Sequence, residues 1–303
     1  MSRTWRIYYN IVFGGFGGLL AWLIVGSLPD LIQNAFFWEV LIGAIAGTGI
    51  GALLGAVDGA LRKRISRLVL GVTRGAGLGL VGGIIGILIG ELLFMLTQGG
   101  VLGRSIGWGV VGAIIGTTEG IAHRAPRKIS YGMIGGALGG LIGGALFEGL
   151  TEAALGMAPA SASGAFDPKT VIWIQTLAAA LGLVLVGACI GSLIALVEDI
   201  LVSAWFNVLR GKQEGTDFNV IKGEMTIGGD DRNDIPVYDQ AVGQKIAVLK
   251  QRGKQVHIES QGGVSLIRAQ GDRQPTPVTH SQVLQDGDKV AVGNTLLVFH
   301  QRK

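Results

Sequence analysis

The feature that most constrains this chain is a series of six apolar runs in its first 200 residues, each about 20 to 27 residues long. A helix rises about 1.5 Å per residue, so about 20 residues cross a hydrocarbon core of about 30 Å. The first run is too long for the apolar core of a signal peptide, and no small-residue cleavage site follows it. The sequence therefore predicts six transmembrane helices, over residues 7–28, 36–60, 72–97, 103–122, 130–152 and 171–197.

The distribution of charge predicts two domains. Residues 1–210 carry 23 charged side chains, and the remaining 93 residues carry the same number. Of the 52 glycines, 40 lie before residue 211. We therefore expect a membrane domain over residues 1–210 and a soluble domain over 211–303. The soluble part has 12 basic and 11 acidic residues, so it offers no basic footprint for nucleic acid.

The basic residues predict the orientation of the spans. Lys and Arg gather at the cytoplasmic ends of transmembrane helices. One set of span ends carries eleven of them, and the opposite set carries only Arg104 and Lys169. We therefore expect both termini in the cytoplasm, and Trp38, Trp108 and Trp173 in the outer interfacial belt. The eleven residues are Arg3, Arg6, Arg62, Lys63, Arg64, Arg67, Arg124, Arg127, Lys128, Arg210 and Lys212.

Glycines recur four residues apart in the second to fifth runs. Residues at this spacing share one face of a helix, and small residues there let two backbones approach closely. We expect glycine-zipper packing, within one chain or between chains, so oligomers are possible. The rows are Gly43, Gly47, Gly51, Gly55 and Gly59; Gly71, Gly75, Gly79 and Gly83; Gly82, Gly86 and Gly90; Gly112, Gly116 and Gly120; and Gly132, Gly136, Gly140 and Gly144.

Parts of the apolar runs resemble one another. GALLGAVDGA at 51–60 resembles GAIIGTTEGIA at 112–122 and, more weakly, GACIGSLIA at 187–195. GGLLAWL at 17–23 likewise resembles GGIIGIL at 82–88 and GGLIGGAL at 139–146. These similarities suggest three related helical hairpins, although glycine richness alone would also produce some of them.

Acidic residues occur at both ends of the predicted spans. Asp58 and Glu119 lie near the cytoplasmic ends, each four residues before a basic side chain, Arg62 or His123, so each can pair along its helix.

Toward the outer ends lie Glu91 and Glu148, and Arg104 is a candidate partner for Glu91. Ion pairs at the interface are the favoured interpretation, and an acidic vestibule that handles ions is the alternative. No charge cluster lies at the centre of a span, and close glycine packing leaves little room for a lumen. A structural core is therefore favoured over a carrier or channel.

Catalytic signals are absent from the sequence. The four histidines form no metal-binding spacing, and neither a G-x-S-x-G motif nor a P-loop occurs. Cys189 is the only cysteine, so no intrachain disulfide can form, and we expect it to be a small buried hydrophobe. We expect no enzyme activity, no cofactor and no metal.

The sequence pattern changes after Val197, where the last apolar run ends. Glu198, Asp199, Trp205 and Phe206 suggest a helix that emerges from the membrane and lies along its surface, or extends straight into the cytoplasm. From about residue 217, short β runs alternate with turns about every ten residues, which predicts an all-β sandwich or barrel.

The soluble part resembles the forkhead-associated domain over about 90 residues. The motifs are Thr226-Ile227-Gly228-Gly229, Asn233-Asp234-Ile235 with Val237 and Asp239, Val242-Gly243-Gln244-Lys245-Ile246, Leu284-Gln285-Asp286-Gly287-Asp288, Val290, Val292-Gly293 and Leu296-Leu297-Val298-Phe299. This resemblance implies a β-sandwich whose loops, in that family, bind phosphothreonine peptides.

Four positions depart from the pattern of that family. Its phosphate-binding arginine is Gly229 here, its phosphate-contacting serine is Gly243, its histidine is Ile246, and its Asn-Gly pair is Gly262-Gly263. A phosphate carries close to two negative charges and needs charged or hydroxyl donors, so the usual site looks dismantled. Arg232 or Lys245 could replace part of it. The binding face expected from the resemblance comprises Gly229, Arg232, Asn233, Gly243, Gln244 and Lys245.

These observations favour an integral membrane scaffold or signalling adaptor of the bacterial inner membrane. Residues 212–303 would bind a cytosolic protein without reading phosphate. Degenerate modules of this kind occur on membrane proteins of bacterial secretion apparatus, which favours a bacterial source. The alternatives are a channel or transporter regulated by the cytoplasmic domain, and a residual phosphothreonine reader linked to a Ser/Thr kinase.

Overall fold

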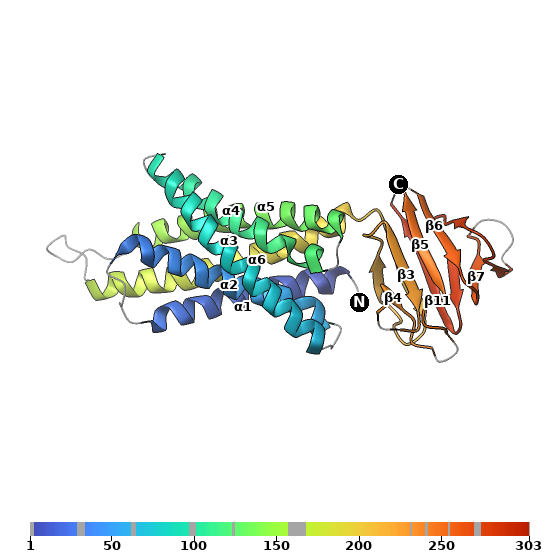
Figure 1. Cartoon of the computed structure of the whole chain (residues 1–303). Helices are drawn as coiled ribbons and strands as arrows, with labels where there is room; N and C mark the ends of the chain where they lie inside the picture. The colour runs from blue at the N-terminus through green and yellow to red at the C-terminus, as the bar shows by residue number, and fades with distance from the viewer. Residues whose placement is uncertain are drawn as a thin grey trace. The chain divides into compact units, whose positions relative to one another are not determined.

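The chain divides into a helical unit and a β unit. A computed structural model describes residues 3–28, 34–61, 65–96, 101–122, 125–156, 168–230, 232–239, 242–253, 255–269 and 274–302. Residues 6–199 form the first compact unit, and residues 1–5 and 200–303 form the second. Figure 1 shows helices in the first and strands in the second.

Six helices in the helical unit are each long and apolar enough to cross a membrane. Each coincides with one predicted span, although the third begins seven residues before its predicted start. The helices are α1 (Arg3–Ser27), α2 (Ala35–Leu61), α3 (Ile65–Leu96), α4 (Val101–Ala122), α5 (Pro126–Gly156) and α6 (Pro168–Leu201).

The glycine rows lie where two helix backbones touch. A Cβ atom on Gly79 of α3 would overlap the carbonyl oxygen of Gly47 on α2, and one on Gly136 of α5 would overlap that of Gly112 on α4. Gly14 and Gly187 bring α1 and α6 together in the same way. The other contacts of the α2–α3 and α4–α5 seams are Gly43 with Gly83, Gly51 with Gly75, Gly55 with Gly71, Gly59 with Leu68, Gly116 with Gly132, Gly120 with Ile129, and Gly140 and Gly144 with Trp108.

The remaining neighbours close the six helices into a ring. Gly17 of α1 lies against Ile50 of α2, and the second glycine row of α3 faces α4, with Gly86 against Val111. On α5, Gly139 lies against the backbone of α6. Each helix therefore packs on the helices before and after it in sequence, and α6 packs back on α1.

Three alternate helices form the centre of this ring. The apolar stretches of α2, α4 and α6 are 56%, 56% and 50% buried, against 33%, 28% and 39% in α1, α3 and α5. Side chains of these three helices fill the core, including Ile50, Val111 and Ile190, each at most 1% exposed. The outer helices α1, α3 and α5 therefore present the larger share of surface to lipid.

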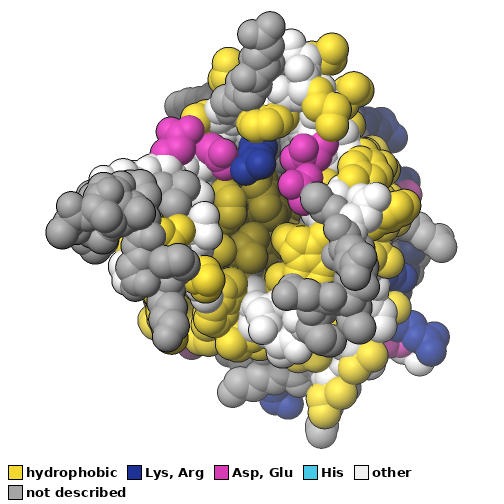
Figure 2. Space-filling view, turned by 90° about the vertical axis from the view of Figure 1, so that its left-hand side faces the viewer, with side chains coloured by type: hydrophobic (Ala, Val, Ile, Leu, Met, Phe, Trp, Pro, Cys, Tyr) yellow, Lys and Arg dark blue, Asp and Glu magenta, His cyan; other side chains and the backbone are white. Residues whose placement is uncertain are grey.

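One end of the helical unit is hollowed, a feature that the apolar runs of the sequence do not predict. Figure 2 shows a depression lined by hydrophobic side chains, with acidic and basic side chains at its rim. Several buried residues in the halves of α2 and α6 toward this end are alanines, such as Ala44, Ala46 and Ala178. Their side chains are shorter than those of the core residues Ile50 and Ile190 on the same two helices.

Trp108 and Cys189 lie in environments that differ from those predicted. Trp108 does not belong to an interfacial belt, because it is 6% exposed and packs in the core with its ring centre 6.2 Å from that of Phe147. Cys189 is half-buried rather than buried, and it lies on α6 beside Gly143 of α5. Trp173, in contrast, is 75% exposed, as a belt residue would be.

The β unit is a sandwich of two sheets. The first has the strand order β2-β1-β11-β10-β7-β8, and the second has β4-β3-β5-β6-β9. Strand β3 pairs antiparallel with β5 and parallel with β4. The strands are β1 (Ala204–Arg210), β2 (Asp217–Asn219), β3 (Glu224–Gly228), β4 (Ile235–Pro236), β5 (Ala247–Arg252), β6 (Gln255–Ser260), β7 (Val264–Ile267), β8 (Thr276–Pro277), β9 (Gln282–Val283), β10 (Lys289–Val292) and β11 (Thr295–Gln301).

The segment after α6 is a strand, so the prediction of a helix through Trp205 and Phe206 is wrong. Strand β1 begins at Ala204, ahead of the expected domain boundary at residue 211, and pairs antiparallel with β11. Its buried residues alternate, and Phe206 is fully buried against Phe299. Alternation of period two marks a strand with one buried face, and this signal is present in the sequence.

Candidate functional site

The candidate binding face lies on two loops of the second sheet, one between β3 and β4 and the other between β4 and β5. The backbone N–H of Gly229 donates a hydrogen bond of 2.8 Å to the carbonyl oxygen of Gly243, and that of Ile246 donates one of 2.9 Å to Ile227. The structure thus brings together the two loops that carry the expected binding residues.

Gly229 cannot serve a phosphate as the family's arginine does. Its N–H is already bound to Gly243. A Cβ atom built on Gly229 would lie 2.7 Å from the carbonyl oxygen of Val242, so a side chain there requires the two loops to separate. A Cβ on Gly243 would meet only Ile246, at 3.4 Å, which is an ordinary contact. The loops therefore leave no space for a side chain at Gly229, the arginine position, but they leave space for one at Gly243, the serine position.

Asn233 holds the two loops in place. It is 7% exposed, and its side-chain amide donates to the carbonyl oxygens of Asp230 at 2.8 Å and Gln244 at 2.6 Å. An amide supplies two donors, so one side chain satisfies one acceptor on each loop. Asn233 therefore lies beneath the candidate binding face and fixes the positions of its two loops, rather than projecting from it.

The projecting side chains are polar or charged. Gln244 and Lys245 are exposed on the β4–β5 loop, and Arg232 is exposed on the β3–β4 loop. The carboxylate of Asp230 accepts the backbone N–H of Arg232 at 3.0 Å, which adds a negative charge to this face. Among the described residues, the face thus presents two cations, Arg232 and Lys245, and the carboxylate of Asp230.

Two aspartates of the resemblance stabilise the sandwich. Asp288 is fully buried and accepts hydrogen bonds from Arg268 at 2.7 Å and from the backbone N–H groups of Ala269 and Gln285. Asp239 accepts the N–H of Asn294 at 2.7 Å, which fixes the β10–β11 turn. Both aspartates therefore hold turns of the sandwich in place.

Residues 207–303 match the family model described as the cytoplasmic domain of the inner membrane component of the type III secretion system. No curated protein sequence matches the chain significantly. The C-terminal unit is a forkhead-associated-type domain. This confirms the resemblance and the order of a helical region followed by an all-β sandwich.

Solved structures similar to this unit cover about a third of the chain. The forkhead-associated domain of the CT664 protein from Chlamydia trachomatis is 23% identical over 33% of this chain and 99% of its own, with a TM-score of 0.28. The cytoplasmic domain of PscD from P. aeruginosa, described as a type III secretion sorting platform protein, is 18% identical over 33% and 82%, with a TM-score of 0.27. A domain from a study of phosphothreonine-dependent interactions is 16% identical over 33% and 98%, with a TM-score of 0.28.

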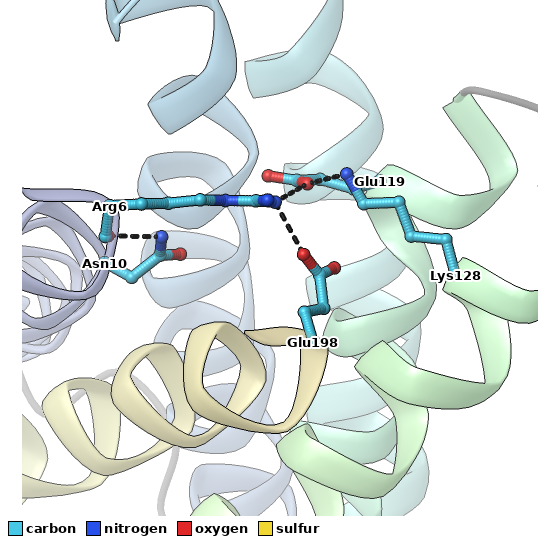
Figure 3. A network of polar contacts seen from close by, with 5 residues as sticks. All are labelled: Arg6, Asn10, Glu119, Lys128 and Glu198. Carbon is cyan, nitrogen blue, oxygen red and sulfur yellow. Dashed lines mark hydrogen bonds and ion pairs between the residues drawn. The ribbon is translucent and has the colours of Figure 1, made fainter. Parts of the chain in front are cut away.

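The helical unit contains two layers of charge, and we call the one near the C-terminal ends of α2, α4 and α6 the first charged layer. Figure 3 shows its centre, where Arg6 of α1 donates to Glu119 of α4 at 3.0 Å and to Glu198 of α6 at 2.6 Å. Lys128 of α5 forms an ion pair with the same Glu119. Asp58 of α2 interacts electrostatically with Arg6. Five helices therefore meet at this layer.

These contacts differ from the expected pairs along single helices. Glu119 pairs with Arg6 and Lys128, which lie on other helices. The expected partners Arg62 and His123 lie outside the described residues. One oxygen of Glu198, Oε1, is buried without a hydrogen-bond partner. A cavity of about 20 Å³, lined in part by Asn10, Thr118 and Glu119, lies in this region and is large enough for one water molecule.

The second charged layer lies at the hollowed end. Arg104 of α4 contacts Glu148 of α5 at 3.3 Å and lies 4.0 Å from Glu91 of α3, the partner proposed from the sequence. Its guanidinium also lies over the ring of Phe94 at 4.8 Å. Glu39 of α2 interacts electrostatically with Glu91 and Arg104. The closer contact with Glu148 joins residues 44 positions apart, which sequence spacing could not show.

The two layers are separated by the thickness of a bilayer core. Glu39 and Asp58 are 19 residues apart on α2, which is about 28 Å of helix. Lys128 and Glu148 are 20 residues apart on α5, about 30 Å. The hydrocarbon core of a bilayer is about 30 Å thick, so one layer lies at each interface. Together with the family match, this supports a location in the inner membrane.

The described residues show no metal-binding cluster. Within the described ranges, no group of three or more His, Cys, Asp or Glu side chains could hold a metal ion. The charged side chains of both layers instead pair with one another.

Proposed function

We propose that this chain is an integral membrane scaffold whose forkhead-associated-type domain recruits a protein partner without reading phosphate. The observation that carries the proposal is the closed position at Gly229. Its N–H is bound to Gly243, and a side chain there would collide with the backbone of Val242. At Gly229, the position of the family's arginine, there is neither a guanidinium nor a free backbone N–H.

The match to an inner membrane component of the type III secretion system supports an assembly role. That match covers only the C-terminal third of the chain, so the role of the whole protein is our proposal. The filled centre of the helical unit, where α2, α4 and α6 supply buried side chains, favours an anchor over a channel or transporter. We further propose that the chain is not an enzyme.

The distribution of basic residues supports a cytoplasmic β unit. The first charged layer includes Arg6 and Lys128, two of the eleven basic residues counted above. Arg67 is also at this end, because its neighbour Leu68 packs against Gly59 of α2, one residue after Asp58. By the positive-inside rule this end faces the cytoplasm. The strands that follow α6 would then meet cytosolic partners.

Peptide binding tests whether the β unit recognises its partner without a phosphate group. We expect a phosphothreonine peptide and its unphosphorylated form to bind the purified full chain with affinities that differ by less than about tenfold, or about 1.4 kcal/mol. The measurement is fluorescence anisotropy, with an intact forkhead-associated domain as the positive control. A larger preference for the phosphopeptide, abolished by Lys245→Gln, would show that the loops still read phosphate.

A further inference from the structure

Arg74 is a charged side chain on the lipid-facing side of a membrane helix. It lies in the tenth position of α3, one of the outer helices, and it is exposed. Within the described part of the chain it has no hydrogen bond and no ion pair, whereas Arg6, Arg104 and Lys128 each pair with a carboxylate. An unpaired charge on such a surface requires a partner from outside the chain.

Arg74 also lies inside the hydrocarbon region, where a charge without a partner is costly. Its neighbour Gly75 packs against Gly51 of α2, which lies seven residues before Asp58 of the first charged layer. Seven helical residues span about 10 Å, so the backbone of Arg74 lies about that far inside the hydrocarbon region. A long basic side chain at this depth extends toward the nearer interface, where the headgroups lie.

The surface around Arg74 suits an acyl chain. Gly77, one turn further along α3, is exposed, and a Cβ atom built there would meet nothing within 4 Å. On the same side, Leu70, Leu80 and Val81 are 44% to 48% exposed. Gly77 therefore leaves open surface among these apolar side chains, one turn deeper in the membrane than Arg74. We call this open surface the notch at Gly77.

We propose that Arg74 and the notch at Gly77 bind an anionic phospholipid of the leaflet next to the first charged layer. The guanidinium would hold the phosphate, and an acyl chain would run along α3 past Gly77. A planar guanidinium matches two phosphate oxygens at once, which a lysine ammonium does not. This site adds to the scaffold function and does not depend on it.

A second copy of the chain fits Arg74 less well. The copies of a membrane dimer related by an axis along the bilayer normal meet at equal depth. The described carboxylates of the six helices lie in the two charged layers or in the last turns of a helix, so none lies at the depth of Arg74. A lipid phosphate, in contrast, is available along the whole interface.

Lipid titration of the delipidated full chain, followed by native mass spectrometry, tests the site. We expect phosphatidylglycerol to bind Arg74→Gln roughly fivefold more weakly than the parent, which corresponds to one basic residue near an anionic surface. Arg74→Lys should lose less, because the charge remains. Gly77→Leu should also weaken binding, because it fills the notch while Arg74 is kept. Arg252→Gln, which removes an exposed charge at the end of β5, should leave binding unchanged.

Two further arms separate the possible partners. Inorganic phosphate at millimolar concentration should not displace the lipid, because it has no acyl chain to place at Gly77. If Arg74→Gln binds phosphatidylglycerol as tightly as Arg252→Gln does, the proposal is wrong. It is also wrong if Arg74→Gln converts an oligomer to a monomer while lipid binding is unchanged, because Arg74 would then face another protein.

Discussion

Replacing Gly79 by alanine is expected to destabilise the helical unit by about 1–3 kcal/mol, the usual cost of inserting atoms into a well-packed contact. The added methyl group would overlap the carbonyl oxygen and carbon of Gly47 on α2. Both are backbone atoms, so no side-chain rotation relieves the overlap, and α2 and α3 must move apart. Because van der Waals contact rather than burial from water holds membrane helices together, even a small separation is costly.

Gly77→Ala is the matched control for this change. It adds the same methyl group two residues away on the same helix, where nothing lies within 4 Å. Its unfolding free energy should stay within about 0.5 kcal/mol of the parent. The measurement is unfolding in mixed detergent micelles, followed by circular dichroism. Equal stability of the two variants would contradict the close approach of α2 and α3.

Replacing Arg6 by methionine is expected to cost about 3 kcal/mol. Arg6 pairs with Glu119 and Glu198, and the side chain of Glu198 is only 5% exposed. Removing one partner of a buried ion pair leaves an uncompensated charge and typically costs about 3–5 kcal/mol. Arg6 itself is 31% exposed, so we expect the lower end of that range. Glu119 keeps Lys128, whereas Glu198 loses the partner that the structure shows.

The double variant Arg6→Met/Glu198→Gln tests whether the unpaired charge of Glu198 causes the loss of stability in Arg6→Met. Neutralising Glu198 removes the orphaned charge, so the double variant should be more stable than Arg6→Met alone. The same unfolding measurement on both single variants and the double variant completes the cycle. Strictly additive losses would mean that the two residues do not interact and that the pair in Figure 3 does not form.

The helices could be predicted from the sequence because membrane spans follow from one local property. A run of about 20 apolar residues has few other stable states, since each backbone polar group must be bonded within the helix. The partners within the charged layers were not predictable. Arg6 and Glu198 are 192 residues apart, and no local pattern reports which helices are neighbours in a ring. Trp108 was misplaced for the same reason, because its position near a span end did not reveal that α4 is a central helix.

The motifs of the β unit were predictable, but its first strand was not. Turn residues and motif spacing marked the sandwich, whereas β1 follows directly on an apolar helix and was read as its continuation. The alternation of Ala204, Phe206 and Val208 was the missed signal.

The structure added one fact about the binding face that no substitution pattern could supply. Sequence comparison shows that Gly229 lacks the family's side chain. Only the geometry shows that its N–H is already used and that the space beside it is filled.

We propose above all that the chain is a scaffold, which recruits its partner through the loops of the β unit independently of phosphate. The most direct measurement is affinity capture of the full chain from its own membranes, with and without phosphatase, compared with Lys245→Glu. Lys212→Glu is the control, because it reverses an exposed charge on the β1–β2 turn, outside the two loops of the candidate binding face. We predict one partner that survives phosphatase, is retained by Lys212→Glu and is weakened by Lys245→Glu. A partner that is lost after phosphatase, or one that binds equally well when residues 212–303 are removed, would contradict the account.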